Sequence, residues 1–257
     1  MGSNNSTNTQ LFLVSMGIGD PGNITLRALK TIEKAEVIFV STPLQEKFSE
    51  LLEGKELHES GRGLFTSLAR RKSPEEEVVA LEEQTRRIIR EAVATGKTVA
   101  VLDYGDPMIY GPQSGYITEF SDLNPIVVPG VSSFNAANAA IARGLTDGPN
   151  SETIILTAAK VAREGYEGSD SLIKLSETKS TMAFFTMGVD LAEVVKQLKQ
   201  NYDGNTPIAI VFNAGELEKQ SVFHATLDTL VEAVGDKPLP FEHMIYVGDF
   251  LRENGYK

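Results

Sequence analysis

The chain has 257 residues, 41% of them hydrophobic, so it is long enough to bury one large core or two ordinary ones. Its formal net charge of -11, from 35 acidic and 24 basic residues, disfavours a broad surface for nucleic acid or for an anionic membrane. The absence of cysteine excludes disulfides, thiolate nucleophiles, iron–sulfur clusters and cysteine-based zinc sites.

The polar start MGSNNSTNTQ lacks the apolar core of a signal peptide, and later apolar runs are too short to span a bilayer, so we expect a soluble, cytoplasmic protein. After this start, short apolar runs alternate with helical patterns, which is typical of α/β units around a mostly parallel sheet. In the first half, strands are predicted at 10–17, 36–41, 97–105 and 125–130, and helices at 24–35, 74–96 and near 115–120. Pro74 and the three glutamates after it suit the start of the longest helix, where proline needs no N–H partner and negative charge meets the positive dipole end.

The second half repeats this alternation after the turn-like stretch TDGPNS at 146–151. Strands are predicted at 152–157, 181–187, 206–213 and 243–250, and helices at 131–145, 191–200 and 227–235. We therefore expect two α/β domains, residues 11–128 and 129–250, with the changeover between Pro129 and Ser151.

A glycine pattern follows the first predicted strand, where Gly17, Gly19 and Gly22 form G-x-G-x-x-G. A dinucleotide site would also need an acidic residue at the end of the second strand, roughly 20 residues further on. That strand ends at Ser41, and Pro21 stands where the loop should turn into a helix. An NAD(P)-binding oxidoreductase therefore stays an alternative, and a disfavoured one.

Several further motifs follow strand ends: GDPMIYG at 105–111, PGVSS at 129–133, TMAFFTMG at 181–188 and PIAIVFNAG at 207–215. With VSMGIGDPG at 14–22, their order and spacing resemble the tetrapyrrole methylases, which use S-adenosylmethionine to methylate precorrins and related macrocycles. The resemblance extends from about Leu11 to about Phe250. It implies two α/β domains with the S-adenosylmethionine site in the cleft between them, and a homodimer.

The motif GDPMIYG also has a physical interpretation of its own. Pro107 keeps Asp106 out of the helical region, so the chain stays extended and then turns sharply before Gly111. Loops at the carboxyl ends of parallel strands are where α/β sheets bind ligands. The Asp106 carboxylate could receive the ammonium group of an amino-acid ligand, although an isolated GDP is more often a plain surface turn.

The resemblance implies contacts with S-adenosylmethionine for Ile18, Tyr104, Gly105, Asp106, Ile109, Ser132, Ser133, Met187, Ala214 and His243. The serine hydroxyls also stand where they can cap the predicted helix. The chain departs from the common family form at Ile18, where proline is usual. It also has Ser41 where uroporphyrinogen methylases carry aspartate, which makes that activity doubtful.

Methyl transfer from a sulfonium requires alignment and exclusion of water more than a strong base. Candidates for a weak base are Asp20, Ser41, Tyr104 and Tyr110, which we leave unranked. Arg62, Arg70 and Arg71 lie in the most basic stretch and could bind the carboxylates of a tetrapyrrole, or simply form a solvated loop. The three histidines show no ligand spacing, so no metal site is expected.

The favoured function is C-methylation of a precorrin or cobalt-precorrin in cobalamin biosynthesis, with S-adenosylhomocysteine as product. The stretches at 130–146 and 152–160 look most like the precorrin-4 branch. A relative that methylates RNA, a diphthamide precursor or a peptide backbone amide is an alternative. The peptide-modifying members resemble Y-G-H-P, however, where this chain has aspartate at position 106. A module that binds the methyl donor without turnover is a further alternative.

Overall fold

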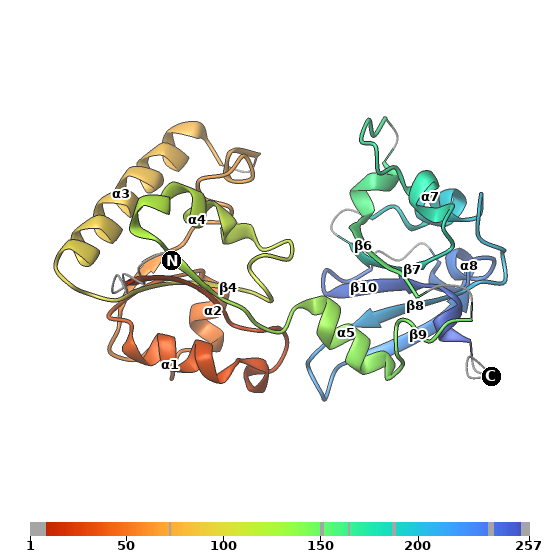
Figure 1. Ribbon diagram of the computed structural model, residues 1–257, viewed down its shortest axis with the longest axis horizontal. Coiled ribbons are helices and arrows are strands. Elements are labelled where there is room, and N and C mark those ends of the chain that lie inside the picture. The colour runs from red at the N-terminus through yellow and green to blue at the C-terminus, as the bar shows by residue number, and fades with distance from the viewer. Residues whose placement is uncertain are drawn as a thin grey trace, which may run out of the picture. The chain divides into compact units, whose positions relative to one another are not determined.

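The computed structural model describes residues 9–71, 73–149, 152–163, 165–186, 189–235 and 239–252. These residues form two compact units, which divide between Ser132 and Ser133. Each unit has its own sheet and its own helices (Figure 1).

The sheet of the first unit has five strands in the order β3-β2-β4-β1-β5, and every neighbouring pair is parallel. The strands are β1 Leu11–Ser15, β2 Val37–Val40, β3 Glu56–Glu59, β4 Val99–Asp103 and β5 Ile126–Val128. The α-helices are α1 Leu26–Lys34, α2 Thr42–Lys47, α3 Glu75–Ala94 and α4 Gly115–Glu119. Short 3-10 turns lie at η1 Pro21–Asn23, η2 Ala69–Arg71, η3 Pro112–Ser114 and η4 Ser121–Leu123.

The three central strands, β1, β2 and β4, are buried on both faces because helices cover both sides of the sheet, and successive side chains of a strand point to opposite sides. Phe39 and Val101 face the layer that contains α3 and α4. Their neighbours Ile38 and Leu102 face the layer that contains α1 and α2. Figure 1 shows these two pairs of helices on opposite sides of the sheet. The result is a three-layer α/β/α unit whose loops emerge at the two ends of the strands.

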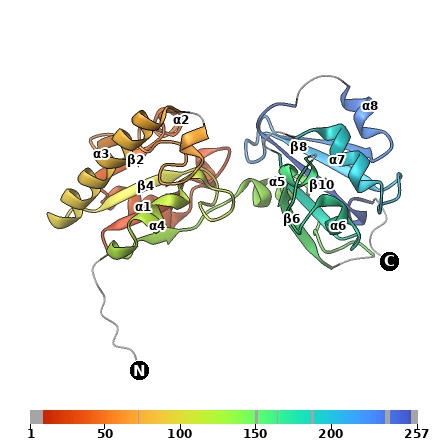
Figure 2. The ribbon, with the colours of Figure 1, turned by 90° about the horizontal axis from the view of Figure 1, so that it is seen from above.

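The sheet of the second unit is mixed, in the order β6-β7-β10-β8-β9, with β6 and β7 parallel and the remaining pairs antiparallel. The strands are β6 Ile154–Ala158, β7 Thr181–Phe185, β8 Pro207–Phe212, β9 Ser221–Thr226 and β10 His243–Val247. The helices are α5 Ser133–Ile141, α6 Leu172–Ser176, α7 Leu191–Leu198 and α8 Leu230–Val234, with 3-10 turns η5 Ala159–Ala162 and η6 Asp249–Leu251. Helix α5 covers one face, where it packs on Ala209 and Tyr246, and α6, α7 and α8 cover the other (Figure 2).

Each strand predicted from the sequence overlaps an observed strand, although β6 continues one residue beyond the predicted range 152–157, and the longest helix begins at Glu75 with Pro74 as its N-cap. The helix predicted at 131–145 is shorter and ends at Ile141, because Ala142 adopts a left-handed φ of 55°. Strands β3 and β9 and helices α2 and α6 were not predicted.

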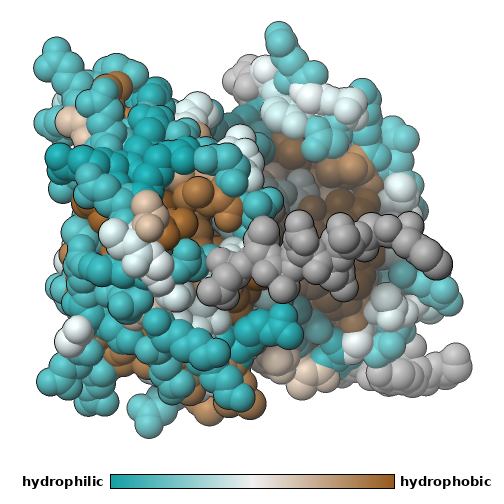
Figure 3. All heavy atoms as spheres, turned by 60° about the vertical axis from the view of Figure 1, so that its left-hand side comes forward, coloured by the Kyte–Doolittle hydropathy of each residue, from teal (hydrophilic) through white to brown (hydrophobic). Residues whose placement is uncertain are grey.

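The surface agrees with the acidic, polar composition. On the face drawn in Figure 3, most side chains are hydrophilic and apolar areas lie between them. Among the described residues, no helix is both long enough and apolar enough to cross a membrane.

Candidate functional site

The parallel sheet of the first unit brings five loops to one edge, because the carboxyl ends of parallel strands all lie on the same side. Most of the predicted site residues stand in these loops. They are Ile18 and Asp20 after β1, Ser41 after β2, Arg62 after β3, Ser132 after β5, and Tyr104, Gly105, Asp106, Ile109 and Tyr110 after β4. Ser133 follows as the first residue of α5 in the second unit.

The loops after β1 and β4 are joined backbone to backbone. The Gly105 N–H donates to the Gly17 carbonyl at 2.8 Å, and the Ser15 hydroxyl donates to the Gly105 carbonyl. Ser15 Oγ also accepts from the Gly17 N–H at 3.1 Å. Gly17 has a φ of 68°, and a Cβ there would lie 2.5 Å from the Asn23 carbonyl oxygen. The first glycine of the G-x-G-x-x-G pattern therefore permits the tight turn in which this loop folds back against its own Asn23.

Asp106 joins the loop after β4 to the loop after β5. Its Oδ1 accepts from the Met108 N–H at 2.9 Å, and its Oδ2 accepts from the Gly130 N–H at 3.3 Å. Gly130 lies so close to Ser15 that a Cβ would overlap the Ser15 hydroxyl. The half-buried carboxylate is thus fixed in place by two backbone amides, and each oxygen retains a further lone pair.

The segment 104–113, here named the β4 loop, presents large side chains to solvent. Tyr104, Met108 and Tyr110 are exposed, Tyr110 by 54% of its surface. Tyr110 also has a left-handed φ of 59°, which a tyrosine adopts only at a cost in free energy. Ile109, which lies in sequence between the exposed Met108 and Tyr110, is half-buried. Backbone strain of this kind is concentrated at ligand sites.

Asp103, the last residue of β4, is a buried carboxyl group that our sequence prediction did not single out. It is 2% exposed, and its two oxygens accept from the Tyr104 N–H at 2.8 Å and the Gln113 N–H at 3.1 Å. Burial raises its pKa to about 7, against the lowering effect of these two hydrogen bonds, and the nearby Asp106 charge adds to the rise. The one signal in the sequence was an aspartate at the end of the apolar run VAVLD.

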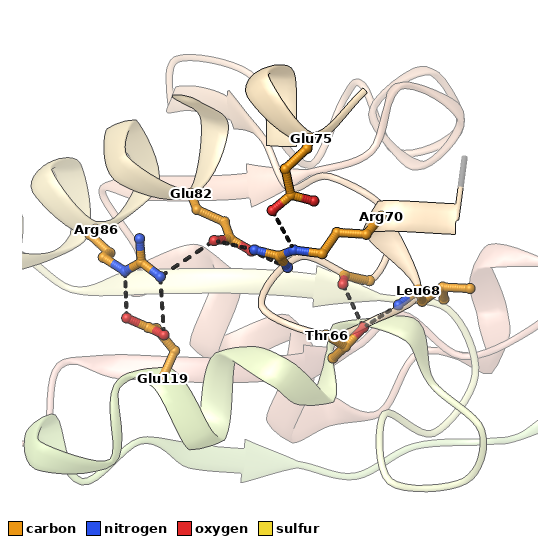
Figure 4. Close-up of polar contacts among 8 residues, drawn as sticks. Thr66, Leu68, Arg70, Glu75, Glu82, Arg86 and Glu119 are labelled. Carbon is orange, nitrogen blue, oxygen red and sulfur yellow. Dashed lines mark hydrogen bonds and ion pairs between the residues drawn. The ribbon is translucent and has the colours of Figure 1, made fainter. Parts of the chain in front are cut away.

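The three arginines predicted to bind substrate lie in residues 60–71, here named the arginine segment. Arg70 in η2 donates from Nη1 and Nη2 to the two Glu82 oxygens at 3.0 and 3.1 Å, and from Nε to Glu75 at 3.0 Å (Figure 4). These hydrogen bonds, first to Glu82 and then to Glu75, raise the pKa of Arg70. Three of its N–H groups are therefore already engaged by helix α3.

The same Glu82 connects Arg70 to a wider network. Glu82 is 5% exposed, and Arg86 Nη2 lies 3.5 Å from its Oε2. Arg86 Nε in turn donates to Glu119 of α4 at 2.5 Å (Figure 4). The network therefore holds η2, α3 and α4 together. Arg71, the neighbour of Arg70 and also predicted to bind substrate, is exposed.

The remaining predicted residues belong to one edge of the second sheet. The strand register places His243, at the start of β10, opposite Phe212 at the end of β8, with Ala214 two residues beyond. The Thr186 hydroxyl after β7 donates to the His243 carbonyl at 2.8 Å. Met187 lies outside the described residues.

The His243 ring has a defined protonation pattern. Nδ1 lies 2.6 Å from the Pro240 carbonyl, which can only accept, so Nδ1 carries the proton and Nε2 is an acceptor. Burial lowers the pKa of His243 and favours this neutral form. Within the part of the chain that the structure describes, no group of three or more histidine, aspartate or glutamate side chains could hold a metal ion.

Comparison with known proteins identifies the class. A profile of the family Tetrapyrrole (Corrin/Porphyrin) Methylases matches residues 10–231. The chain is 31% identical over 255 residues to a cobalt-precorrin-4 C(11)-methyltransferase of Methanocaldococcus jannaschii, covering 97% of this chain and 91% of the relative.

Solved structures agree with this match. A cobalt-precorrin-4 methyltransferase of cobalamin biosynthesis superposes with a TM-score of 0.73 at 25% identity, over 97% of this chain and 99% of the other. A uroporphyrin-III C-methyltransferase from Thermus thermophilus, solved with S-adenosylhomocysteine, shares the fold with a TM-score of 0.66 at 22% identity, over 94% and 98% of the two chains.

The chain is therefore a methyltransferase. Its fold has two α/β units, each with its own sheet, as predicted from the sequence. It belongs to the tetrapyrrole methylase family, whose members depend on S-adenosylmethionine. The family, the enzyme class and the cofactor predicted from the sequence are thus confirmed. The individual site residues stay predictions.

Proposed function

We propose that this enzyme methylates carbon 11 of precorrin-4 or cobalt-precorrin-4, with S-adenosylhomocysteine as the second product. The observation that carries the proposal is the match along almost the whole chain to an enzyme of that name. The superposition on a cobalt-precorrin-4 methyltransferase supports the same branch.

The loops at the carboxyl edge of the first sheet fit an amino-acid ligand. The Asp106 carboxylate is half-buried, and its remaining lone pairs can accept hydrogen bonds from an ammonium group. We assign Gly105, Asp106 and Ile109 to the methionine part of S-adenosylmethionine, and Ala214 and His243 to its adenosine. The further proposed contacts are Ile18, Tyr104, Ser132, Ser133 and Met187.

When bound, S-adenosylmethionine supplies an electrophilic methyl group on a sulfonium. The protein then has to align the substrate carbon with that methyl and keep water away from the charged sulfur. A rigid loop set suits this task, because Ser15, Gly17 and Asp106 fix the loops to one another. Asp20, Ser41, Tyr104 and Tyr110 are retained as candidates for the group that accepts a proton from the methylated carbon.

A precorrin carries several carboxylate side chains, which arginine recognises with paired hydrogen bonds. We propose Arg62 and Arg71 for this role. Arg70, predicted for the same role, already donates to two carboxylates of α3, so we assign it to anchoring η2.

The test is methyl transfer from S-adenosylmethionine with an isotopically labelled methyl group to cobalt-precorrin-4 and to precorrin-4. Mass spectrometry and carbon NMR of the product are expected to show one added methyl, at C11. Uroporphyrinogen III, a peptide and ribosomal RNA serve as comparison substrates. Label on one of these, or at another carbon, would overturn the assignment.

We also propose a cytoplasmic homodimer, as the family resemblance implies. Light scattering coupled to size exclusion is expected to give twice the 27.9 kDa mass of the chain. A mass equal to one chain at micromolar concentration would contradict it.

A further inference from the structure

The β4 loop is closed by a single buried side chain. Asp103 accepts from the N–H of the first residue of the loop, Tyr104, and from the N–H of the last, Gln113. Its own backbone is part of the sheet, where it is paired with Ser15, and its carbonyl accepts from the Met16 N–H at 2.8 Å. A carboxylate on such a rigid base fixes both ends of the loop that carries Gly105 and Asp106.

Gln113 extends this connection to a second loop. It is 3% exposed, and its Nε2 donates to Ser60 Oγ at 3.1 Å and to the Gly61 carbonyl at 2.5 Å. The Tyr116 hydroxyl donates to the Ser60 carbonyl at 2.6 Å. Ser60 and Gly61 begin the arginine segment directly after β3.

The two loops so connected are not neighbours in the sheet. Strand β2 lies between β3 and β4, so the contact of Gln113 with Ser60 passes over the carboxyl end of β2, which is followed by Ser41. The other end of the arginine segment is fastened to α3 by Arg70 and Glu82. Movement of the segment near Arg62 is thus limited from both ends, and one of the limits is the β4 loop.

We propose that Asp103 and Gln113 are positioning residues, which couple the loop that receives the methyl donor to the arginine segment that receives the substrate. This inference rests on the proposed function. A ligand that orders the β4 loop then also orders the arginine segment, so the second ligand pays less conformational entropy when it binds.

The first test uses Gln113→Leu, which removes both Nε2 hydrogen bonds and keeps the backbone N–H to Asp103. Leucine leaves the Gly61 carbonyl and the Ser60 hydroxyl without this donor, but it also removes Gln113 Oε1, an acceptor with no hydrogen-bond partner within the described part of the chain, so the variant is expected to fold with reduced stability. Hydrogen–deuterium exchange is followed in 60–71 and in 104–113, with and without S-adenosylhomocysteine.

In the wild type, S-adenosylhomocysteine is expected to slow exchange in both segments. In Gln113→Leu, protection of 104–113 should persist and protection of 60–71 should be lost, while calorimetry gives a dissociation constant within about threefold of the wild type. Gln197→Leu is the matched control, because the Gln197 amide donates to two acceptors in the second unit, the Ala162 carbonyl and Glu193. It should behave as the wild type.

The second test concerns Asp103. Asp103→Ala releases both ends of the β4 loop and is expected to weaken S-adenosylhomocysteine binding by about tenfold or more. Asp103→Asn keeps one oxygen acceptor, for the Tyr104 N–H, and should bind S-adenosylhomocysteine more tightly than Asp103→Ala but more weakly than the wild type. A residue that acted only on stability would change the midpoint of unfolding but leave the affinity of the folded fraction unchanged.

The outcomes separate the two proposals. If the wild type does not bind S-adenosylhomocysteine, the proposed function fails and this inference with it. If the wild type binds but shows no protection of 60–71, or if Gln113→Leu keeps that protection, only the coupling is overturned. Should Gln113→Leu not fold, Ser60→Ala removes the side-chain acceptor of the same contact and is judged by the same exchange measurement.

Discussion

The Asp106 carboxylate accepts two backbone N–H groups, and we propose it as the acceptor for the ammonium group of the methyl donor. Asp106→Ala removes both the loop contacts and the proposed acceptor for the ammonium group. We expect S-adenosylhomocysteine to bind at least about tenfold more weakly, since a charge-assisted hydrogen bond contributes about 1.5–3 kcal/mol. Titration calorimetry measures the loss, and Glu83→Ala, at an exposed position of α3, serves as a control for removing one acidic side chain. Unchanged affinity would show that Asp106 only shapes the loop.

Asp103 should leave a signature in the pH dependence of stability. Its pKa in the folded protein is raised from 3.8 to about 7, so between these values the folded state binds a proton that the unfolded state has released. The contribution of Asp103 to stability is therefore fully present below about pH 4 and is lost as the pH rises to about 7. The loss is on the order of 4 kcal/mol at most, because each pKa unit corresponds to about 1.4 kcal/mol.

Urea unfolding of the wild type and of Asp103→Asn, from pH 4 to pH 8, isolates this effect. Carboxylates with a lowered pKa, such as Glu56 and Glu193, titrate in both proteins and cancel in the difference. The free energy of unfolding of the variant should rise relative to the wild type as the pH rises to about 7, and then level off. Parallel curves would mean that the carboxyl group is not protonated in this range.

At the scale of elements, Arg70 connects η2 to α3, and its substitution can show whether it anchors η2 or binds substrate. Among the residues that the structure describes, Arg70→Ala leaves the buried Glu82 carboxylate with Arg86 as its remaining cation, 3.5 Å away. We expect the thermal midpoint to fall by several degrees, because removing one partner of a buried ion pair leaves an uncompensated charge. Arg70→Lys should not fully restore it, since lysine lacks the planar guanidinium that meets both Glu82 oxygens and Glu75 together.

The control is Arg71→Ala, at the exposed neighbouring position. It should leave the thermal midpoint unchanged and raise the KM for a tetrapyrrole if Arg71 binds substrate. If Arg70→Ala instead raises the KM and leaves the midpoint unchanged, Arg70 is a substrate ligand, as the sequence alone predicted.

How far the sequence predicts this structure depends on the element. Buried strands such as β2 and β4 are continuous apolar runs and were predicted at the right residues. Strand β3 reads ELHE and lies at the edge of its sheet, where Glu56 pairs with Lys97, so it has neither an apolar run nor an alternating pattern. Edge strand β9 reads SVFHAT, and its residues are exposed or only partly buried, so it too lacks a continuous apolar run.

The positions of the site residues could be predicted where they follow the ends of buried strands. The contacts between side chains that are distant in sequence could not. The sequence placed Gly105 and Asp106 directly after a buried strand, which is where they lie. It could not show that Arg70 contacts Glu82, because Glu75, Glu76 and Glu77 are nearer in sequence. The burial of Asp103 likewise depends on a backbone N–H ten residues further on, at Gln113, and on a loop geometry that composition does not encode.

At the scale of the whole molecule, the family assignment makes a prediction about ligand choice. A glycine pattern of this kind forms the dinucleotide loop of other folds, but here Gly17 pairs with Gly105 of the β4 loop. A ligand that binds only the folded protein stabilises it by about 2.7 kcal/mol when present at a hundredfold excess over its dissociation constant. S-adenosylhomocysteine should therefore raise the thermal midpoint by roughly 5 °C or more under these conditions.

NADPH at the same concentration should leave that midpoint unchanged, and so should S-adenosylhomocysteine added to Asp106→Ala at the concentration that stabilises the wild type. Differential scanning calorimetry records all three. Because the two units have separate cores, the scan is analysed for more than one transition before a single midpoint is quoted. A shift of the midpoint with NADPH and none with S-adenosylhomocysteine would contradict the proposed methyl-donor site. A shift with S-adenosylhomocysteine in the wild type, and none with it in Asp106→Ala, would support a donor site that depends on the Asp106 carboxylate.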